Sequence, residues 1–261
     1  MRYGVLSNLF WLTMSNNNQI ENYQLKIRMK EWSVLKNFIP ENSTFLDIGC
    51  GSGHNMYLAK TEKKCTVFGV DPDPGGHGFG RYNKHNEFDE GSIINGQADE
   101  LPFEDNQFDV VFCSHVLEHI KQKDKSLKEM KRILKDDGII IIGMPTSTMS
   151  WIAFFSNLLF KFHINLLFFL KSLNSKDFWF RFCQIWVNQS HSYPIAKYVF
   201  YDFVQYRKSS WRKLIQKYFH ITEEPKMYLY CYPDFRLKFF PIHRNKFLSS
   251  SAFFIGSKKT I

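Results

Sequence analysis

The sequence has few cysteines, and none belongs to a paired motif. Its five cysteines, with no Cys-x-x-Cys spacing among them, are Cys50, Cys65, Cys113, Cys183 and Cys231. This pattern offers neither a disulfide framework nor a thiolate metal site, so we expect reduced packing cysteines, a cytoplasmic protein and no metal. A secretory signal is not expected either, because the apolar stretch 6–14 is short, follows a single arginine and lacks a small-residue cleavage site.

Acidic residues are scarce in the second part of the chain. Residues 1–144 carry 17 Lys and Arg against 20 Asp and Glu, whereas residues 145–261 carry 17 against 5. The net charges are therefore −3 and +12, and the second part also holds 30 of the 45 aromatic residues. A basic and aromatic surface favours an anionic partner, such as lipid headgroups, a phosphorylated substrate or nucleic acid.

The strongest candidate for a membrane helix is interrupted by polar residues. The stretch 151–170 has 15 apolar residues out of 20, but Asn157, Lys161 and Asn165 recur at four-residue intervals. A spanning helix is disfavoured, because a lysine near its centre costs about 2.5–3.5 kcal/mol. Two interpretations stay open: a helix lying in the membrane interface, with basic residues beside it for anionic headgroups, and a lid helix buried against the sheet or a second copy.

What the sequence does have is a glycine-rich loop after a short apolar run. The run 45–48 is too short for a helix and predicts a buried strand. Glycines at positions 49, 51 and 53 permit positive φ and a close approach of a ligand to the backbone. A helix is expected from His54, so its first N–H groups would face that ligand. The dinucleotide pattern G-x-G-x-x-G is excluded, because it needs glycine at position 54.

Two carboxylates indicate what the loop binds. Asp47 precedes the first glycine, and a carboxylate there suits a cationic amino group such as that of S-adenosylmethionine. Asp71 follows the next apolar run, 65–70, and a carboxylate at the tip of a second strand can accept hydrogen bonds from both hydroxyls of a ribose.

Together with three later motifs, these residues resemble the class I S-adenosylmethionine-dependent methyltransferases, in the branch of ubiquinone- and menaquinone-type small-molecule methyltransferases. The later motifs are Gln97-Ala-Asp-Glu-Leu-Pro-Phe103, Phe108-Asp-Val-Val-Phe112 and Val116-Leu-Glu-His-Ile120. The resemblance, which runs from about residue 42 to 144 and resumes weakly near the C-terminus, implies S-adenosyl-L-methionine as cofactor. It also implies a Rossmann-like α/β fold: a seven-stranded, mostly parallel sheet with one antiparallel strand and helices on both faces. The apolar stretch 151–170 adds to this fold an apolar, aromatic helical insertion after the fifth strand.

We expect four segments along the chain: an N-terminal helical segment over the cofactor cleft (1–40), a cofactor-binding core (41–144), a helical insertion on the acceptor side (145–220), and C-terminal strands that complete the sheet (221–261). Helices are expected at 19–38, 124–134, 198–205 and 209–219. Strands are expected at 65–70, 93–94, 108–113 and 139–142, with a sixth and a seventh at 227–232 and 252–256.

The resemblance assigns the cofactor site to residues at the carboxyl ends of the strands. They are Asp47, Gly49, Cys50, Gly51, Gly53, Asp71, Pro72, Gln97, Ala98, Asp99, Ser114 and His115. The partner of the adenine amino group is left open between Gln97, whose side-chain oxygen can accept that hydrogen bond, and Asp99.

Histidines are the candidates for a general base, which a hydroxyl acceptor would need. His115 follows the fourth strand at its ligand end, and His191 would come from the acceptor side, so these two are the predicted catalytic residues. The pair Glu118-His119 is more typical of a structural role under the cofactor. A hydrogen-bonded scaffold role stays open for each histidine.

Three functions are compatible with these patterns. The first is methyl transfer, to oxygen, on a small-molecule, lipid-linked or glycan-type acceptor, by a cytoplasmic protein peripheral to the inner membrane face. The second is an RNA or protein methyltransferase. Nucleic acid is not expected as a partner, because the sequence has no separate RNA-binding module and no Asn/Asp-Pro-Pro-Tyr motif after the fourth strand. The third is a cofactor-binding subunit without catalysis. The oligomeric state stays open.

Overall fold

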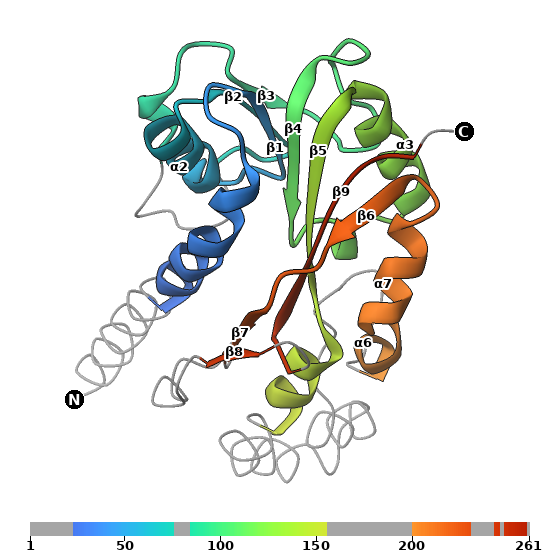
Figure 1. Ribbon diagram of the computed structural model, residues 1–261. Helices are drawn as coiled ribbons and strands as arrows, with labels where there is room; N and C mark the ends of the chain where they lie inside the picture. Colours follow the sequence, from blue (N-terminus) through green and yellow to red (C-terminus); the bar gives the residue numbers. More distant parts are fainter. Residues whose placement is uncertain (1–22, 76–83, 156–199, 231–242, 246–247, 260–261) are drawn as a thin grey trace, which may run out of the picture.

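The computed structural model describes residues 23–75, 84–155, 200–230, 243–245 and 248–259 (Figure 1). Seven strands form the main sheet: β1 Thr44–Ile48, β2 Thr66–Asp71, β3 Ile93–Asn95, β4 Phe108–Ser114, β5 Leu134–Pro145, β6 Phe219–Glu223 and β9 Ser251–Lys258. Their order is β3-β2-β1-β4-β5-β9-β6. Strand β9 is antiparallel to both neighbours, and the other pairs are parallel. The predicted Rossmann-like sheet with one antiparallel strand is confirmed.

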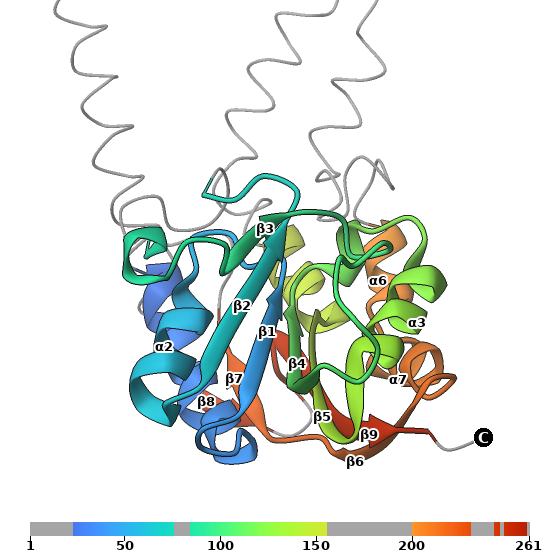
Figure 2. The same ribbon diagram turned by 90° about the horizontal axis from the view of Figure 1, so that it is seen from above.

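Helices cover both faces of this sheet. Residues 23–35 are helical and continue into the short turn η1 Lys36–Phe38, and residues 147–155 are helical as well. The labelled helices are α2 His54–Lys63, α3 Lys123–Ile133, α6 Phe200–Gln205 and α7 Lys208–Ile215. Segment 23–35 and α2 pack on one face, whereas α3 and α7 pack on the other. Figure 2 shows the two layers on either side of the strands. Because both faces are covered, the central strands are almost continuously buried.

The helices follow the spacing of their apolar residues. Helix α3 buries Leu127, Met130 and Ile133, which share one face, and α7 buries Trp211 and Ile215 one turn apart. The carboxyl ends of the parallel strands meet at one edge of the sheet, and short turns follow them there. One of these is η4 Leu117–His119, which carries the predicted Glu118-His119 pair.

The prediction for the sixth strand was wrong. Strand β7, Met227–Leu229, pairs with β8, His243–Asn245, in a separate two-stranded sheet. The edge strand of the main sheet is β6, whose first residue, Phe219, was expected to end a helix. The physical reason is spacing: Phe219 lies four residues after Ile215, so it extends the apolar stripe of α7 although the helix ends at Ile215.

The predicted apolar insertion lies mostly outside the described residues. Residues 147–155 are helical, and 156–199 are not described. The loop after Asp71 is described up to residue 75, and its far end contains only the short turn η3 His85–Glu87. Within the described part of the chain, no helix is both long and apolar enough to span a membrane.

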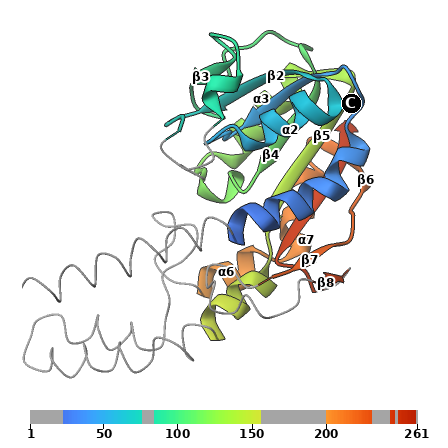
Figure 3. The ribbon, with the colours of Figure 1, turned by 90° about the vertical axis from the view of Figure 1, so that its left-hand side faces the viewer.

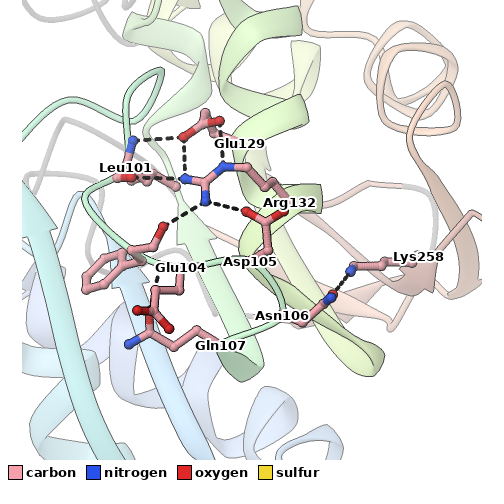
Figure 4. A network of polar contacts seen from close by, with 9 residues as sticks. Leu101, Glu104, Asp105, Asn106, Gln107, Glu129, Arg132 and Lys258 are labelled. Atoms are coloured by element: carbon pink, nitrogen blue, oxygen red, sulfur yellow. Dashed lines mark hydrogen bonds and ion pairs between the residues drawn. The ribbon is translucent and has the colours of Figure 1, made fainter.

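One arginine fastens the loop before β4 to helix α3. Arg132 donates from Nη2 to Glu129 Oε2 at 2.8 Å and to the carbonyl of Leu101 at 3.0 Å. From Nη1 it donates to the carbonyl of Phe103 at 2.7 Å and to Asp105 Oδ1 at 2.8 Å (Figure 4). The loop leads into β4, so this network holds the strand whose carboxyl end reaches the site.

Candidate active site

A cavity of about 690 Å³ lies at the carboxyl ends of the central parallel strands, a volume typical of a small-molecule site. Nine of the twelve predicted cofactor-site residues line it: Gly49, Cys50, Gly51, Asp71, Pro72, Gln97, Ala98, Ser114 and His115. The fold therefore brings together residues that are up to 66 positions apart in the chain, from Gly49 to His115. In open α/β sheets this edge is where ligands bind.

Three predicted residues stand outside the lining. Asp47 lies beneath the loop, with a residue exposure of 2%. Gly53 caps the start of α2 in the left-handed conformation, and a Cβ there would come within 2.7 Å of the Phe88 ring. Asp99 lies 3.8 Å from Lys125 Nζ, whereas Gln97 lines the cavity.

The first glycine of the loop has no room for a side chain. Gly49 has φ +73°, and a Cβ at this position would lie 2.2 Å from Cγ2 of Val116. Its N–H donates to the carbonyl of Val70 at 2.7 Å, which ties the loop to the end of β2. Glycine is required here both for its backbone angle and for the close contact with the segment that follows β4.

Asp71 joins the tip of β2 to the glycine loop. Its Oδ2 accepts the N–H of Gly51 at 2.9 Å, and its Oδ1 accepts the N–H of Asp73 at 2.8 Å. Each carboxylate oxygen has a second lone pair, so both oxygens can accept a further hydrogen bond from a ligand in the cavity.

Asp47 is a buried carboxyl group next to this pair. Burial, and then the neighbouring Asp71, raise its pKa to about 8, although the side chain of Asn55 hydrogen-bonds to it. Among the described residues, its Oδ2 has no hydrogen-bond partner. A buried carboxyl with one oxygen that lacks a donor, directly below the glycine loop, fits a ligand that brings a positive charge.

His115 lines the same cavity and forms a pair with Glu118, which lies behind the lining. His115 adopts φ +57° and donates its backbone N–H to the carbonyl of Gly143 at 2.9 Å. Its Nδ1 lies 3.5 Å from Oε1 of Glu118, whose side chain is fully buried. Burial raises the pKa of Glu118 to about 8. His119 also lines the cavity, with Nε2 4.0 Å from the same oxygen, while predicted His191 lies outside the described residues.

Sequence reasoning missed several residues of the cavity wall. Arg28 comes from helical segment 23–35, and its Nη1 donates to Oε2 of buried Glu31 at 2.6 Å. Glu31 also accepts hydrogen bonds from Tyr230 and Ser251, so a network anchors the helix across the sheet. The amphipathic pattern predicts the helix, but nothing in it singles out Arg28.

His54, at the start of α2, is the second cavity residue that was missed. Burial, with Arg28 and Lys84 nearby, lowers its pKa to about 4, so it is neutral at physiological pH. Among the described residues, no group of three or more His, Cys, Asp or Glu side chains is placed to hold a metal ion.

Comparison with known proteins agrees with this geometry. Residues 46–142 match the family described as "Methyltransferase domain". They form a class I S-adenosylmethionine-dependent methyltransferase domain. The structure is similar to a crystal structure of an S-adenosylmethionine-dependent methyltransferase, possibly a histamine N-methyltransferase, from Thermotoga maritima, with a TM-score of 0.56. That likeness covers 98% of this chain and 96% of the other at 16% identity, so it concerns the fold.

Two curated relatives are similar to part of this chain. Sterol 4-C-methyltransferase strm-1 of Caenorhabditis elegans is 33% identical over 105 residues, which are 40% of this chain and 31% of the relative. The ubiquinone/menaquinone biosynthesis C-methyltransferase UbiE of Idiomarina loihiensis is 43% identical over 49 residues, 19% of this chain and 20% of the relative. The chain therefore spans less than a third of the length of either relative.

Proposed function

We propose that this protein transfers the methyl group of S-adenosylmethionine to an oxygen atom of a small-molecule acceptor that is lipid-linked or glycan-like. The observation that carries the proposal is one cavity lined both by Asp71 and the glycine loop and by His115, whose Nδ1 lies 3.5 Å from Oε1 of Glu118. S-adenosylmethionine supplies an electrophilic methyl group on sulfur, which an acceptor hydroxyl attacks while the sulfur–carbon bond breaks.

At the cofactor end, each polar wall residue suits one part of the cofactor. The Asp71 oxygens would accept the ribose hydroxyls, and the side-chain oxygen of Gln97 would accept the adenine amino group. Below the loop, the carboxyl of Asp47 matches the ammonium of the methionine part, and the guanidinium of Arg28 matches its carboxylate. Holding donor and acceptor in one enclosure supplies much of the rate enhancement of such a displacement.

At the acceptor end, His115 would take the proton of the attacking hydroxyl. Its Nδ1 lies 3.5 Å from Oε1 of Glu118, a buried acid that would hold the ring in one orientation. Glu118 is thus a positioning residue, and His115 is the proposed catalytic base.

The cofactor site is tested by calorimetric titration of S-adenosylmethionine into wild-type protein and Asp71→Asn. We expect the variant to bind at least about tenfold more weakly, because an amide donates where the carboxylate accepts. Asp73→Asn is the matched control, since it makes the same change two residues later in the loop and should bind normally. Unchanged affinity in Asp71→Asn, or no binding by the wild type, would contradict the proposal.

The transfer itself is tested by release of S-adenosylhomocysteine with a total lipid extract or a water-soluble metabolite extract as acceptor source. His115→Asn removes the base but keeps a residue that tolerates positive φ. We expect turnover to fall about 100-fold or more, a far larger effect than the change in cofactor affinity. If the wild type binds the cofactor but no extract supports product release, a non-catalytic cofactor-binding role replaces the proposal.

A further inference from the structure

Exposed apolar side chains gather where the chain leaves β5. Trp151 and Phe155, in helical segment 147–155, are 46% and 53% exposed, and Tyr201 and Val204, on α6, are 38% and 50% exposed. Tyr201 and Val204 are three residues apart and share one side of their helix. These four residues are called the aromatic patch below.

The two segments that carry the patch are held against each other. The ring of Trp151 stacks on Phe203 of α6, with centroids 4.1 Å apart and planes inclined by 7°. Ser147 donates its hydroxyl to the carbonyl of Phe203 at 3.0 Å and its N–H to the carbonyl of Tyr206 at 2.9 Å. Segment 147–155 and α6 lie side by side at one end of the sheet in both Figure 1 and Figure 3. These contacts hold the two segments together, so the four residues of the aromatic patch form one surface.

This surface adjoins the cavity. Met149, on the same helical segment, is buried and lines the cavity wall, whereas Trp151 and Phe155 are exposed. One short helix thus presents one residue to the cavity and two to the outside. A molecule held at the patch would be close to the cavity wall at Met149.

Among the described residues, a positive charge lies next to the patch. Exposed Arg207 directly follows α6. The sequence between Phe155 and Phe200, which leaves from one patch segment and returns to the other, contains five Lys and Arg and a single Asp. Exposed Trp and Tyr side chains with basic residues beside them match the interface of a bilayer that contains anionic lipids.

We propose that the aromatic patch docks the protein on an anionic lipid bilayer, which brings a lipid-borne acceptor to the cavity. The delivery of an acceptor rests on the proposed methyl transfer, but the docking does not require the cofactor. The docking energy comes from burial of Trp151, Phe155 and Val204 in the headgroup region, with basic residues held near the lipid phosphates.

The test is co-sedimentation of the full chain with vesicles of phosphatidylcholine alone and of phosphatidylcholine mixed with phosphatidylglycerol. Phe155→Asp and Val204→Asp each place a negative charge in the patch at an exposed position. Met29→Asp is the matched control, because Met29 is 40% exposed on helical segment 23–35, which packs on the other face of the sheet. Thermal melting and titration with S-adenosylmethionine show that each variant is folded.

We expect the wild type and Met29→Asp to bind only the anionic vesicles, less strongly at high salt. Each patch variant should bind these vesicles at least about tenfold more weakly, with its cofactor affinity unchanged. Absence of wild-type binding would overturn the proposal, as would equal binding by Phe155→Asp and Val204→Asp. Either result would leave the methyltransferase proposal standing, because cofactor titration and product release are measured without vesicles.

Discussion

Replacing Asp47 by asparagine tests the electrostatics of the cavity floor through the pH dependence of stability. The pKa of this carboxyl is raised from 3.8 to about 8 by burial and by Asp71. The folded protein therefore holds a proton that the unfolded chain releases near pH 4. Stability from this proton is fully present below the unfolded pKa and is lost as the pH rises to the folded pKa. Asparagine has nearly the same shape and does not titrate.

The size of the effect follows from the pKa difference. Each pH unit between the two pKa values removes about 1.4 kcal/mol of wild-type stability, so Asp47 accounts for up to about 4 kcal/mol between pH 5 and pH 8. Asp47→Asn does not lose this stability as the pH rises. Glu118 has a similarly raised pKa, but it is present in both proteins and its contribution cancels in the comparison.

The assay is urea unfolding of the cofactor-free protein at several values between pH 5 and pH 8. We expect Asp47→Asn to gain at least about 2 kcal/mol over the wild type across this range. Asp109→Asn is the control: although burial opposes it, the hydrogen bond from Lys135 holds the pKa of Asp109 below its usual value, so no change in slope is expected in this window. Parallel curves for wild type and Asp47→Asn would refute the reasoning.

Two other predictions concern packing. Gly49→Ala should lower the free energy of unfolding by roughly 2–4 kcal/mol and abolish cofactor binding, because its Cβ would overlap Val116 as well as strain a positive φ; denaturant melts and calorimetry measure this. Arg132→Ala should cost about 2–3 kcal/mol in urea unfolding, because it removes five hydrogen bonds that Arg132 donates to two carboxylates and two backbone carbonyls.

Each of these changes has a control in the chain. Gly91 also has a positive φ, +84°, but no atom lies within 4 Å of the position that a Cβ would take. Gly91→Ala should therefore lower the free energy of unfolding only by the cost of the backbone strain, about 1 kcal/mol. Lys128→Ala, an exposed change on the same helix as Arg132, should alter stability by less than about 0.5 kcal/mol. Equal losses in either matched pair would contradict the packing argument.

Local features of the sequence predicted the cofactor end of the cavity. The backbone angles of a strand-to-helix turn require glycine at positions 49 and 51, and Asp71 is identified by its place at the tip of β2. Such constraints act over a few neighbouring residues, so a single sequence displays them. The same holds for the class of fold, since buried strands alternating with amphipathic helices require a covered parallel sheet.

The sequence prediction was wrong where one spacing of apolar residues is compatible with either a helix or a strand. Phe219 continues the four-residue spacing of Trp211 and Ile215, yet it begins the edge strand β6. Pairing with β9 makes this segment a strand, because the free side of β9 offers a row of backbone donors and acceptors to β6. Nothing in the sequence of β6 itself indicates that it pairs with β9.

The sequence by itself determined the domain class, the glycine loop and the carboxylate at the end of β2, because these depend on short-range geometry. Only the tertiary structure decided that Arg28 and Tyr230 line the same cavity as His115. It also decided that Glu118 is fully buried beside His115. These properties depend on contacts between residues up to about two hundred positions apart, such as the hydrogen bond from Tyr230 to Glu31. Burial and the electrostatics of the site arise only when those segments pack together, so no local pattern carries them.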